Sequence, residues 1–263
     1  MVYKIKTRIM DNYKDKRRGW VRSELILAFN LYCRLPFGKN NPKNPEVVAL
    51  AHVLNRTPSA VSWKLANFAS LDPALSRKGA KNSGKLDKEI FDEFSNDWEG
   101  MVFESELIRI DSMELGRREL ILNLESFEGK ERKASVRARV NQQFFRKMVL
   151  ASYNNKCAIT GMGIDDLLVA SHIVPWSVDH SNQLNPQNGI SLNRLHDYAF
   201  DKGLITIDID YKVRLSQHLL SIEKDEANLK FFKVYEGEKI ILPSKFVPNQ
   251  TFLEYHRENI FLK

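Results

Sequence analysis

The stretch LVASHIVPW at residues 168–176, with NGISL at 188–192 and HDYAFDKG at 196–203, decides the fold of the second half of this 263-residue chain. Its order predicts a strand that ends at a histidine, a loop with an asparagine, a second strand and a helix with another histidine. Gly203 suits the end of that helix. A longer helix is expected from residue 136 to about 153. The second half is therefore expected to combine helices with short strands.

This ordered set of His172, Asn188 and His196 resembles the HNH endonuclease family, and most closely its restriction-type members. The likeness covers residues 137–207 and implies a ββα-metal fold that hydrolyses phosphodiester bonds in DNA. It implies that His172 is the general base, a role that suits a side chain titrating near neutral pH. It further implies that Asn188 holds the loop and orients that base, and that His196 binds a divalent cation, Mg²⁺ or another such as Mn²⁺.

One residue departs from the family pattern. Many members place Asp or His directly before the base histidine as a second metal ligand, whereas this chain has Ser171. A neutral hydroxyl is a poor ligand for a hard cation, so another carboxylate or water molecules must complete the shell. Asp201 is the first candidate for that metal ligand, and Asp197 and Asp179 are weaker ones. A degenerate, inactive site is the alternative.

The composition, with 43% hydrophobic and 28% charged residues, is ordinary for a soluble globular protein. No apolar run is long enough for a transmembrane helix, so no membrane partner is expected. The two cysteines lie far apart in the sequence, which favours a reducing, cytoplasmic compartment. We expect an α+β protein with a helical, helix-turn-helix-like domain at 1–100, a helical linker at 101–135 and a ββα-metal HNH nuclease domain at 136–263.

The formal net charge is +7, and the positive residues gather in two runs, 1–22 and 130–147. Clustered positive charge attracts a polyanion, because contacts to phosphates release condensed counterions. A merely solvated surface is the alternative interpretation of each run. The runs predict DNA contacts by five arginines: Arg17, Arg18, Arg137, Arg139 and Arg146.

Residues 45–54 and 57–68 predict two short helices joined by a tight turn. Thr57 followed by Pro58 is a strong helix start. The pattern is typical of a helix-turn-helix, whose second helix enters the DNA major groove, and an ordinary helical hairpin is the alternative. On the second helix, Val61, Leu65 and Phe68 are expected to be buried, and Trp63 is expected to be a core or inter-domain aromatic. Three polar residues are expected to contact DNA: Ser62, Lys64 and Asn67.

The leading hypothesis is a metal-dependent endonuclease for double-stranded DNA, with a restriction enzyme as the favoured role. A homodimer is expected because cutting both strands is simpler with two active sites. The first alternative is a DNA-binding regulator or accessory protein whose HNH site has decayed, which Ser171 suggests. The second is a nuclease that acts on RNA or on any nucleic acid, which the helix-turn-helix-like segment disfavours.

Overall fold

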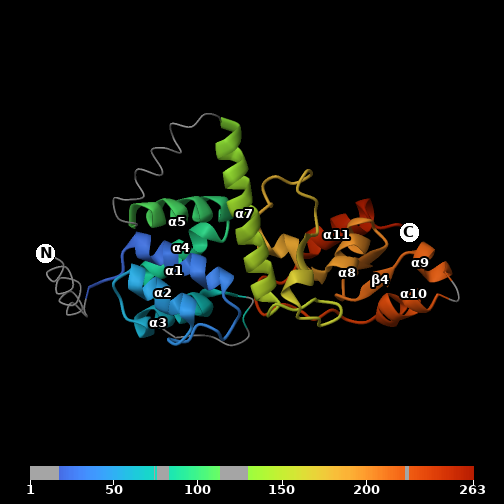
Figure 1. Cartoon of the computed structure of the whole chain (residues 1–263), viewed down its shortest axis with the longest axis horizontal. Coiled ribbons are helices and arrows are strands. Elements are labelled where there is room, and N and C mark those ends of the chain that lie inside the picture. Colours follow the sequence, from blue (N-terminus) through green and yellow to red (C-terminus); the bar gives the residue numbers. More distant parts are fainter. Residues whose placement is uncertain (1–17, 74, 76–82, 113–129, 223–224) are drawn as a thin grey trace, which may run out of the picture. The chain divides into compact units, whose positions relative to one another are not determined.

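The computed structural model describes residues 18–73, 75, 83–112, 130–222 and 225–263 (Figure 1). Contacts divide the chain into two compact units, residues 1–135 and 136–263. The first unit is helical and the second combines helices with small antiparallel sheets, so the expected α+β class is confirmed. Within the described ranges, no helix is long and apolar enough to cross a membrane.

Helix α1 forms the centre of the first unit. Its apolar residues from Leu25 to Cys33 are buried, and it contacts all four of the other helices described in this unit. The ring of Phe29 lies against those of Phe68, Phe91 and Trp98, which come from three different helices. The helices are α1 (Arg22–Arg34), α2 (Pro45–Val53), α3 (Pro58–Leu71), α4 (Lys85–Phe94) and α5 (Trp98–Ser112).

Helix α5 covers the start of the segment that was expected to be a linker. Its Met101 and Val102 are buried, and it packs against α1. Apolar side chains at these positions therefore add to the core of the first unit. The rest of the expected linker, residues 113–129, lies outside the described residues.

The α2–α3 hairpin follows local sequence rules. The Thr57 side chain accepts a hydrogen bond from the Ala60 N–H, and Pro58 occupies the first helical position, as predicted. Asn55 in the turn has φ 50°, a left-handed conformation that asparagine tolerates. The predicted buried stripe of α3 is confirmed, because its three residues are fully buried. Trp63 is 65% exposed, so it is not a core residue of this unit, and its alternative as an inter-domain aromatic stays a prediction.

The second unit is built around the pairing of two strands, β1 and β2, and the helix that follows them. Helix α7 begins at Lys130, so the last part of the expected linker, residues 130–135, is helical. The elements are α7 (Lys130–Ser152), β1 (Leu168–His172), β2 (Gly189–Asn193), α8 (Arg194–Asp201), β3 (Ile205–Ile207), β4 (Val213–Leu215), α9 (Gln217–Ser221), α10 (Glu226–Phe231) and α11 (Gln250–Asn259). Strands β1 and β2 pair antiparallel, and β3 and β4 form a second antiparallel pair.

Gly189 sets how closely β2 approaches α7. In the register of the sheet it lies opposite His172. A Cβ atom at Gly189 would lie 2.5 Å from Val149 Cγ2 and 2.9 Å from Phe145 Cζ, so a side chain has no room there. Strand β2 leads straight into α8, whose first turn is capped by the Asn193 side chain, which accepts a hydrogen bond from the His196 N–H.

Helix α11 is held against α8 and β3 by the buried ring of His256. Its Nε2–H donates to the Phe200 carbonyl oxygen at 3.0 Å, so Nδ1 accepts a hydrogen bond from the Thr206 hydroxyl at 2.8 Å. The ring also stacks on Phe200, with 3.7 Å between centroids. Burial lowers the pKa of His256 to about 4, so the ring is neutral near neutral pH.

We predict that Gly189→Ala lowers the free energy of unfolding by about 1–3 kcal/mol, the usual cost of overpacking a filled core. The new methyl group must displace Val149 and Phe145. Gly163→Ala is the matched control, because its Cβ would meet neighbours only at ordinary contact distance, 3.5 Å or more. Chemical denaturation of both variants measures the difference. Equal stability of the two would contradict the close packing of β2 on α7.

Candidate active site

A pocket of about 450 Å³ opens where β1 ends. His172 and Ser171 reach it from β1, Asp197 and Asp201 from α8, and Trp176 from the following loop. The two aspartates are four residues apart on α8, which places them on the same face of the helix. The pocket therefore brings together an imidazole and two carboxylates from separate elements.

The orientation of His172 is determined by its hydrogen bond and its stacking partner. Nε2 lies 2.9 Å from the carbonyl oxygen of Gln183. The ring stacks on that of Phe145, with centroids 4.0 Å apart and planes at 6°. Burial lowers the pKa of His172, although the Gln183 carbonyl and the Asp197 carboxylate partly offset this effect. The imidazole is therefore neutral at physiological pH and held in one orientation.

Asn188 is fully buried, and its side chain forms hydrogen bonds with the backbone of the loop between β1 and β2. Its Oδ1 accepts a hydrogen bond from the Val174 N–H at 2.8 Å, and its Nδ2 donates to the carbonyl oxygens of Val174 and Asn182 at 3.2 and 3.3 Å. These bonds fix both ends of the loop that carries Gln183. Asn188 thus positions the carbonyl group that binds His172 without touching the imidazole through a hydrogen bond of its own.

The two carboxylates of the pocket disfavour each other's charge. Partial burial and then the neighbouring Asp197 carboxylate raise the pKa of Asp201 to about 6, which Lys202 partly opposes. Burial also raises the pKa of Asp197, although the Ser171 hydroxyl and Arg194 act in the opposite direction. Carboxylates with raised pKa values that face one pocket are common at functional sites.

These donors suit a divalent cation. Carboxylate oxygens are the ligands that Mg²⁺ prefers, and a cation between Asp197 and Asp201 would relieve their repulsion. The Ser171 hydroxyl is buried beside these carboxylates and lowers the pKa of Asp197. The part of the chain that is described holds no group of three His, Cys, Asp or Glu residues that could bind a metal. Two protein carboxylates would therefore share the cation with water and substrate oxygens.

His196 does not join this pocket. It is buried, its Nε2–H donates to the Phe231 carbonyl oxygen at 2.8 Å, and its Nδ1 accepts from Asn193 Nδ2 at 2.9 Å. The rings of Phe232 and Tyr235 also contact it edge to face. Because both ring nitrogens are used within the fold, the geometry does not support the predicted role of His196 as a metal ligand. Its neighbour Asp197 points to the pocket instead.

In the sequence, the four-residue spacing of Asp197 and Asp201 is the signal that places these two carboxylates together. Residues four apart lie on one helix face, and His196 is offset from that face by one position. Asp179, the other weak candidate, accepts hydrogen bonds from Ser181 and Asn182 in its own loop. It does not line the pocket with His172.

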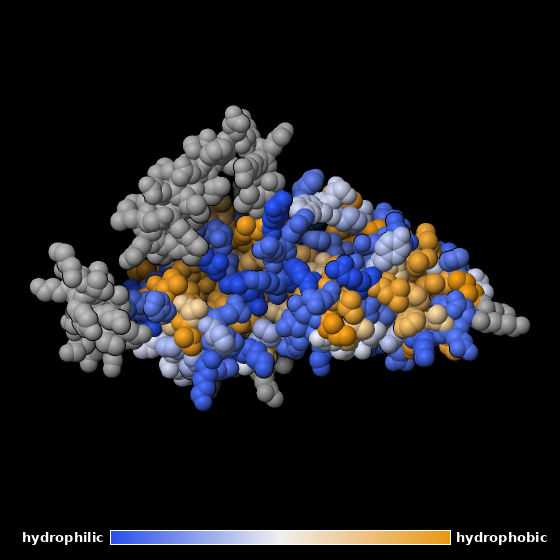
Figure 2. All heavy atoms as spheres, viewed as in Figure 1, coloured by the Kyte–Doolittle hydropathy of each residue, from blue (hydrophilic) through white to orange (hydrophobic). Residues whose placement is uncertain are grey.

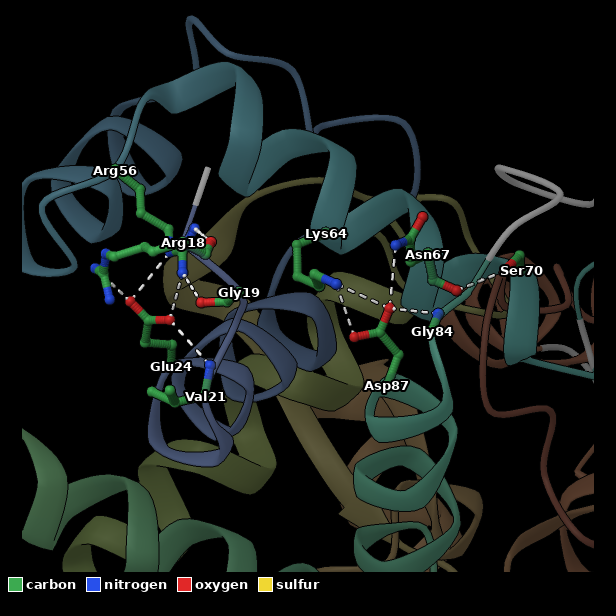
Figure 3. Close-up of polar contacts among 10 residues, drawn as sticks. All are labelled: Arg18, Gly19, Val21, Glu24, Arg56, Lys64, Asn67, Ser70, Gly84 and Asp87. Carbon is green, nitrogen blue, oxygen red and sulfur yellow. Dashed lines mark hydrogen bonds and ion pairs between the residues drawn. The ribbon is translucent and has the colours of Figure 1, made fainter. Parts of the chain in front are cut away.

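The polar residues of α3 that were expected to contact DNA bind within the first unit, and Figure 3 shows two of them, Lys64 and Asn67. Lys64 Nζ lies 2.7 and 2.9 Å from the two carboxylate oxygens of Asp87, and Asn67 Nδ2 donates to the same carboxylate at 3.1 Å. Ser62 Oγ donates to the Asn40 carbonyl oxygen. Lys64 and Asp87 are both buried, so this lysine is not available to a phosphate group.

The arginine before α1 also has internal partners. Arg18 donates to the Leu54 carbonyl oxygen at 2.8 Å and pairs with Glu24 at 2.7 Å. Arg56 pairs with the same carboxylate and lies over the ring of Trp20, 4.1 Å from its centroid. About two fifths of the Arg18 side chain remains exposed. Arg17, the adjacent predicted contact, lies outside the described residues.

The arginines of α7 differ in their availability. Arg146 donates to the Leu168 carbonyl oxygen at 2.6 Å and to that of Asp165 at 3.0 Å, so it ties α7 to the start of β1. Arg139 is exposed. The side chain of Arg137 lies outside the described part of the structure. Of the second basic run, Arg139 is therefore the predicted contact that the structure leaves open to a partner.

Comparison with known proteins identifies one family. Residues 157–208, from the turn after α7 to just beyond β3, match the family model of the HNH endonucleases. No curated protein matches the chain at a significant level. The matched segment contains the β1–β2 pair, the loop with Asn188 and helix α8, which together build the pocket around His172.

We predict that Lys64→Ala lowers the free energy of unfolding by about 3 kcal/mol, because it leaves the buried Asp87 carboxylate without its cation. Denaturant unfolding measures this loss. Lys43→Ala removes an exposed lysine of the same unit and is the control, with an expected change below about 0.5 kcal/mol. A Lys64→Ala protein that keeps full stability but loses affinity for DNA would restore the original expectation of a DNA contact.

Proposed function

We propose, on the premise that this chain carries an HNH endonuclease domain over residues 157–208, that it is a metal-dependent DNA endonuclease with His172 as its general base. The observation that carries the proposal is the hydrogen bond from His172 to the Gln183 carbonyl oxygen, next to two carboxylates in one pocket. A general base, a site for a cation and a match to this family each support the hydrolysis of a phosphodiester bond.

The tautomer of His172 suits a general base. A carbonyl oxygen can only accept a hydrogen bond, so Nε2 carries the proton and Nδ1 carries the lone pair. Within the described residues, Nδ1 has no hydrogen-bond partner. His172 can therefore take a proton from a water molecule that attacks the phosphorus atom. The Gln183 carbonyl and the Asp197 carboxylate then stabilise the imidazolium that results, since both favour the charged form of the ring.

The carboxylates of Asp197 and Asp201 would hold the divalent cation, Mg²⁺ or another such as Mn²⁺. When bound, such an ion stabilises negative charge on the phosphate and on the leaving oxygen. Asp197 would serve both the cation and the protonated His172, because its charge acts on that ring. This acidic pair also weakens the case for a decayed site, since it supplies the charge that Ser171 lacks.

We further propose that the first unit binds duplex DNA and that the protein acts in restriction as a homodimer. The support is the helix-turn-helix-like α2–α3 hairpin, joined to a nuclease domain in one chain. Because Ser62, Lys64 and Asn67 bind within the unit, the face of α3 that would meet DNA is the exposed one, with Thr57, Ser59 and Trp63. Sedimentation analysis with and without duplex DNA tests the dimer.

We predict that purified protein cleaves plasmid DNA with Mg²⁺ or Mn²⁺ and that His172→Ala slows cleavage by about 10²- to 10⁴-fold, the usual contribution of a general base. His218→Ala, which removes an exposed histidine on α9, should cleave like the wild type. Gel assays on methylated and unmethylated plasmids measure the rates. Tight DNA binding without cleavage of either plasmid would favour the regulator with a decayed site.

We predict that Asp197→Asn and Asp201→Asn each raise the Mg²⁺ concentration for half-maximal cleavage by about tenfold or more, because changes even around metal ligands cost that much affinity. Calorimetric titration with Mn²⁺ should show the same weakening without DNA. Asp210→Asn, in an exposed turn, is the control. The assignment fails if His196→Gln, in a folded protein, weakens Mn²⁺ binding while the two α8 aspartate variants do not.

A further inference from the structure

A second pocket, of about 240 Å³, shares His172 and Trp176 with the site described above. Helix α7 contributes Asn141, Gln142, Phe145 and the cationic Arg146 to its wall, and β1 and the following loop contribute the rest. All of these residues belong to the second unit. A group bound here would therefore lie directly beside the proposed general base.

The walls of this pocket suit a flat, uncharged ring. The rings of Phe145 and His172 stack on each other, with centroids 4.0 Å apart, so they line the pocket as one aromatic pair, and the Trp176 ring lies 6.5 Å from that of His172. Val169, Ala170 and Leu184 add aliphatic surface. Among the described residues that line it there is no Asp or Glu, in contrast to the pocket with Asp197 and Asp201. The two pockets at His172 thus differ in chemistry, one acidic and one mostly apolar.

Amide groups at the rim of this pocket can recognise a polar edge. Asn141 and Gln142 stand next to each other on α7, and within the described residues neither side chain has a hydrogen-bond partner. Side-chain amides offer a donor and an acceptor together, the arrangement that pairs with the edge of a nucleobase. Arg146, by binding the Leu168 carbonyl oxygen, holds this part of α7 against β1.

We propose that this pocket binds one unstacked base of the nucleic-acid substrate, beside the phosphodiester bond that is hydrolysed at His172. The inference rests on the proposed nuclease function, because the base belongs to that substrate. Aromatic walls receive an unstacked base, and amide groups bind its hydrogen-bonding edge, as in proteins that take bases out of a stack. Asn141 and Gln142 then determine which base is accepted next to the cleaved bond.

The test is a titration of the full chain, in EDTA, with dAMP, dGMP, dCMP and dTMP, followed by NMR of the Asn141 and Gln142 side-chain amides and the Trp176 indole N–H. At least one nucleotide should shift these signals to saturation. Deoxyribose 5-phosphate, which lacks the base, should leave them unchanged. Gln142→Ala should raise the dissociation constant about tenfold, the scale of losing one bidentate contact to a base.

Gln143→Ala is the matched control, because Gln143 is the exposed neighbour on α7 that does not line the pocket. The proposal is overturned if deoxyribose 5-phosphate gives the same shifts, if no nucleotide shifts the signals, or if the Gln143 variant weakens binding as much as the Gln142 variant. Plasmid cleavage separates the two proposals. Cleavage without nucleotide binding contradicts only the base pocket, whereas nucleotide binding without cleavage contradicts the nuclease and, with it, a base held beside a hydrolysed bond.

Discussion

At Gly189 the backbone of β2 lies so close to α7 that Val149 and Phe145 already fill the space of a methyl group. This contact fixes the sheet, because β1 pairs with β2 and His172 lies opposite Gly189. It also leaves the Phe145 ring where it stacks on His172. The preceding residue, Asn188, binds the loop through its side chain. Close packing of one glycine thus positions the imidazole, its aromatic partner and the carbonyl group that orients it.

Charge is distributed differently in the two units. In the first unit, positive side chains that precede or belong to the hairpin are neutralised inside: Lys64 by Asp87, and Arg18 and Arg56 by Glu24. Figure 2 shows that hydrophilic residues still cover much of the visible surface of the described chain. In the second unit, Asp197 and Asp201 face one pocket, where burial raises the pKa of both and the Asp197 carboxylate further raises that of Asp201. The cation that we propose between these two carboxylates would offset the repulsion between their charges.

His172 is shared by two pockets of opposite character. The acidic one offers oxygen donors for a cation and, through it, for a phosphate, whereas the apolar one offers rings and amides. A nucleotide has two adjacent parts that match these pockets: a charged phosphodiester, which binds cations, and a flat, uncharged base. Under the proposed function, a nucleotide would place its phosphate in one pocket and its base in the other, with His172 between them.

Local sequence was enough to predict the elements of the site, because turn residues, caps and alternating apolar positions act over a few residues. The strand that ends at His172, the start of α3 at Thr57 and Pro58, and the HNH family all follow from it. Only the tertiary structure decided which neighbour on α8 faces the pocket, since one helical position rotates a side chain by about 100°. It also decided that Lys64 pairs with Asp87, a residue 23 positions away. Long-range packing of this kind leaves no local pattern, because the partner of a buried charge depends on how the helices meet.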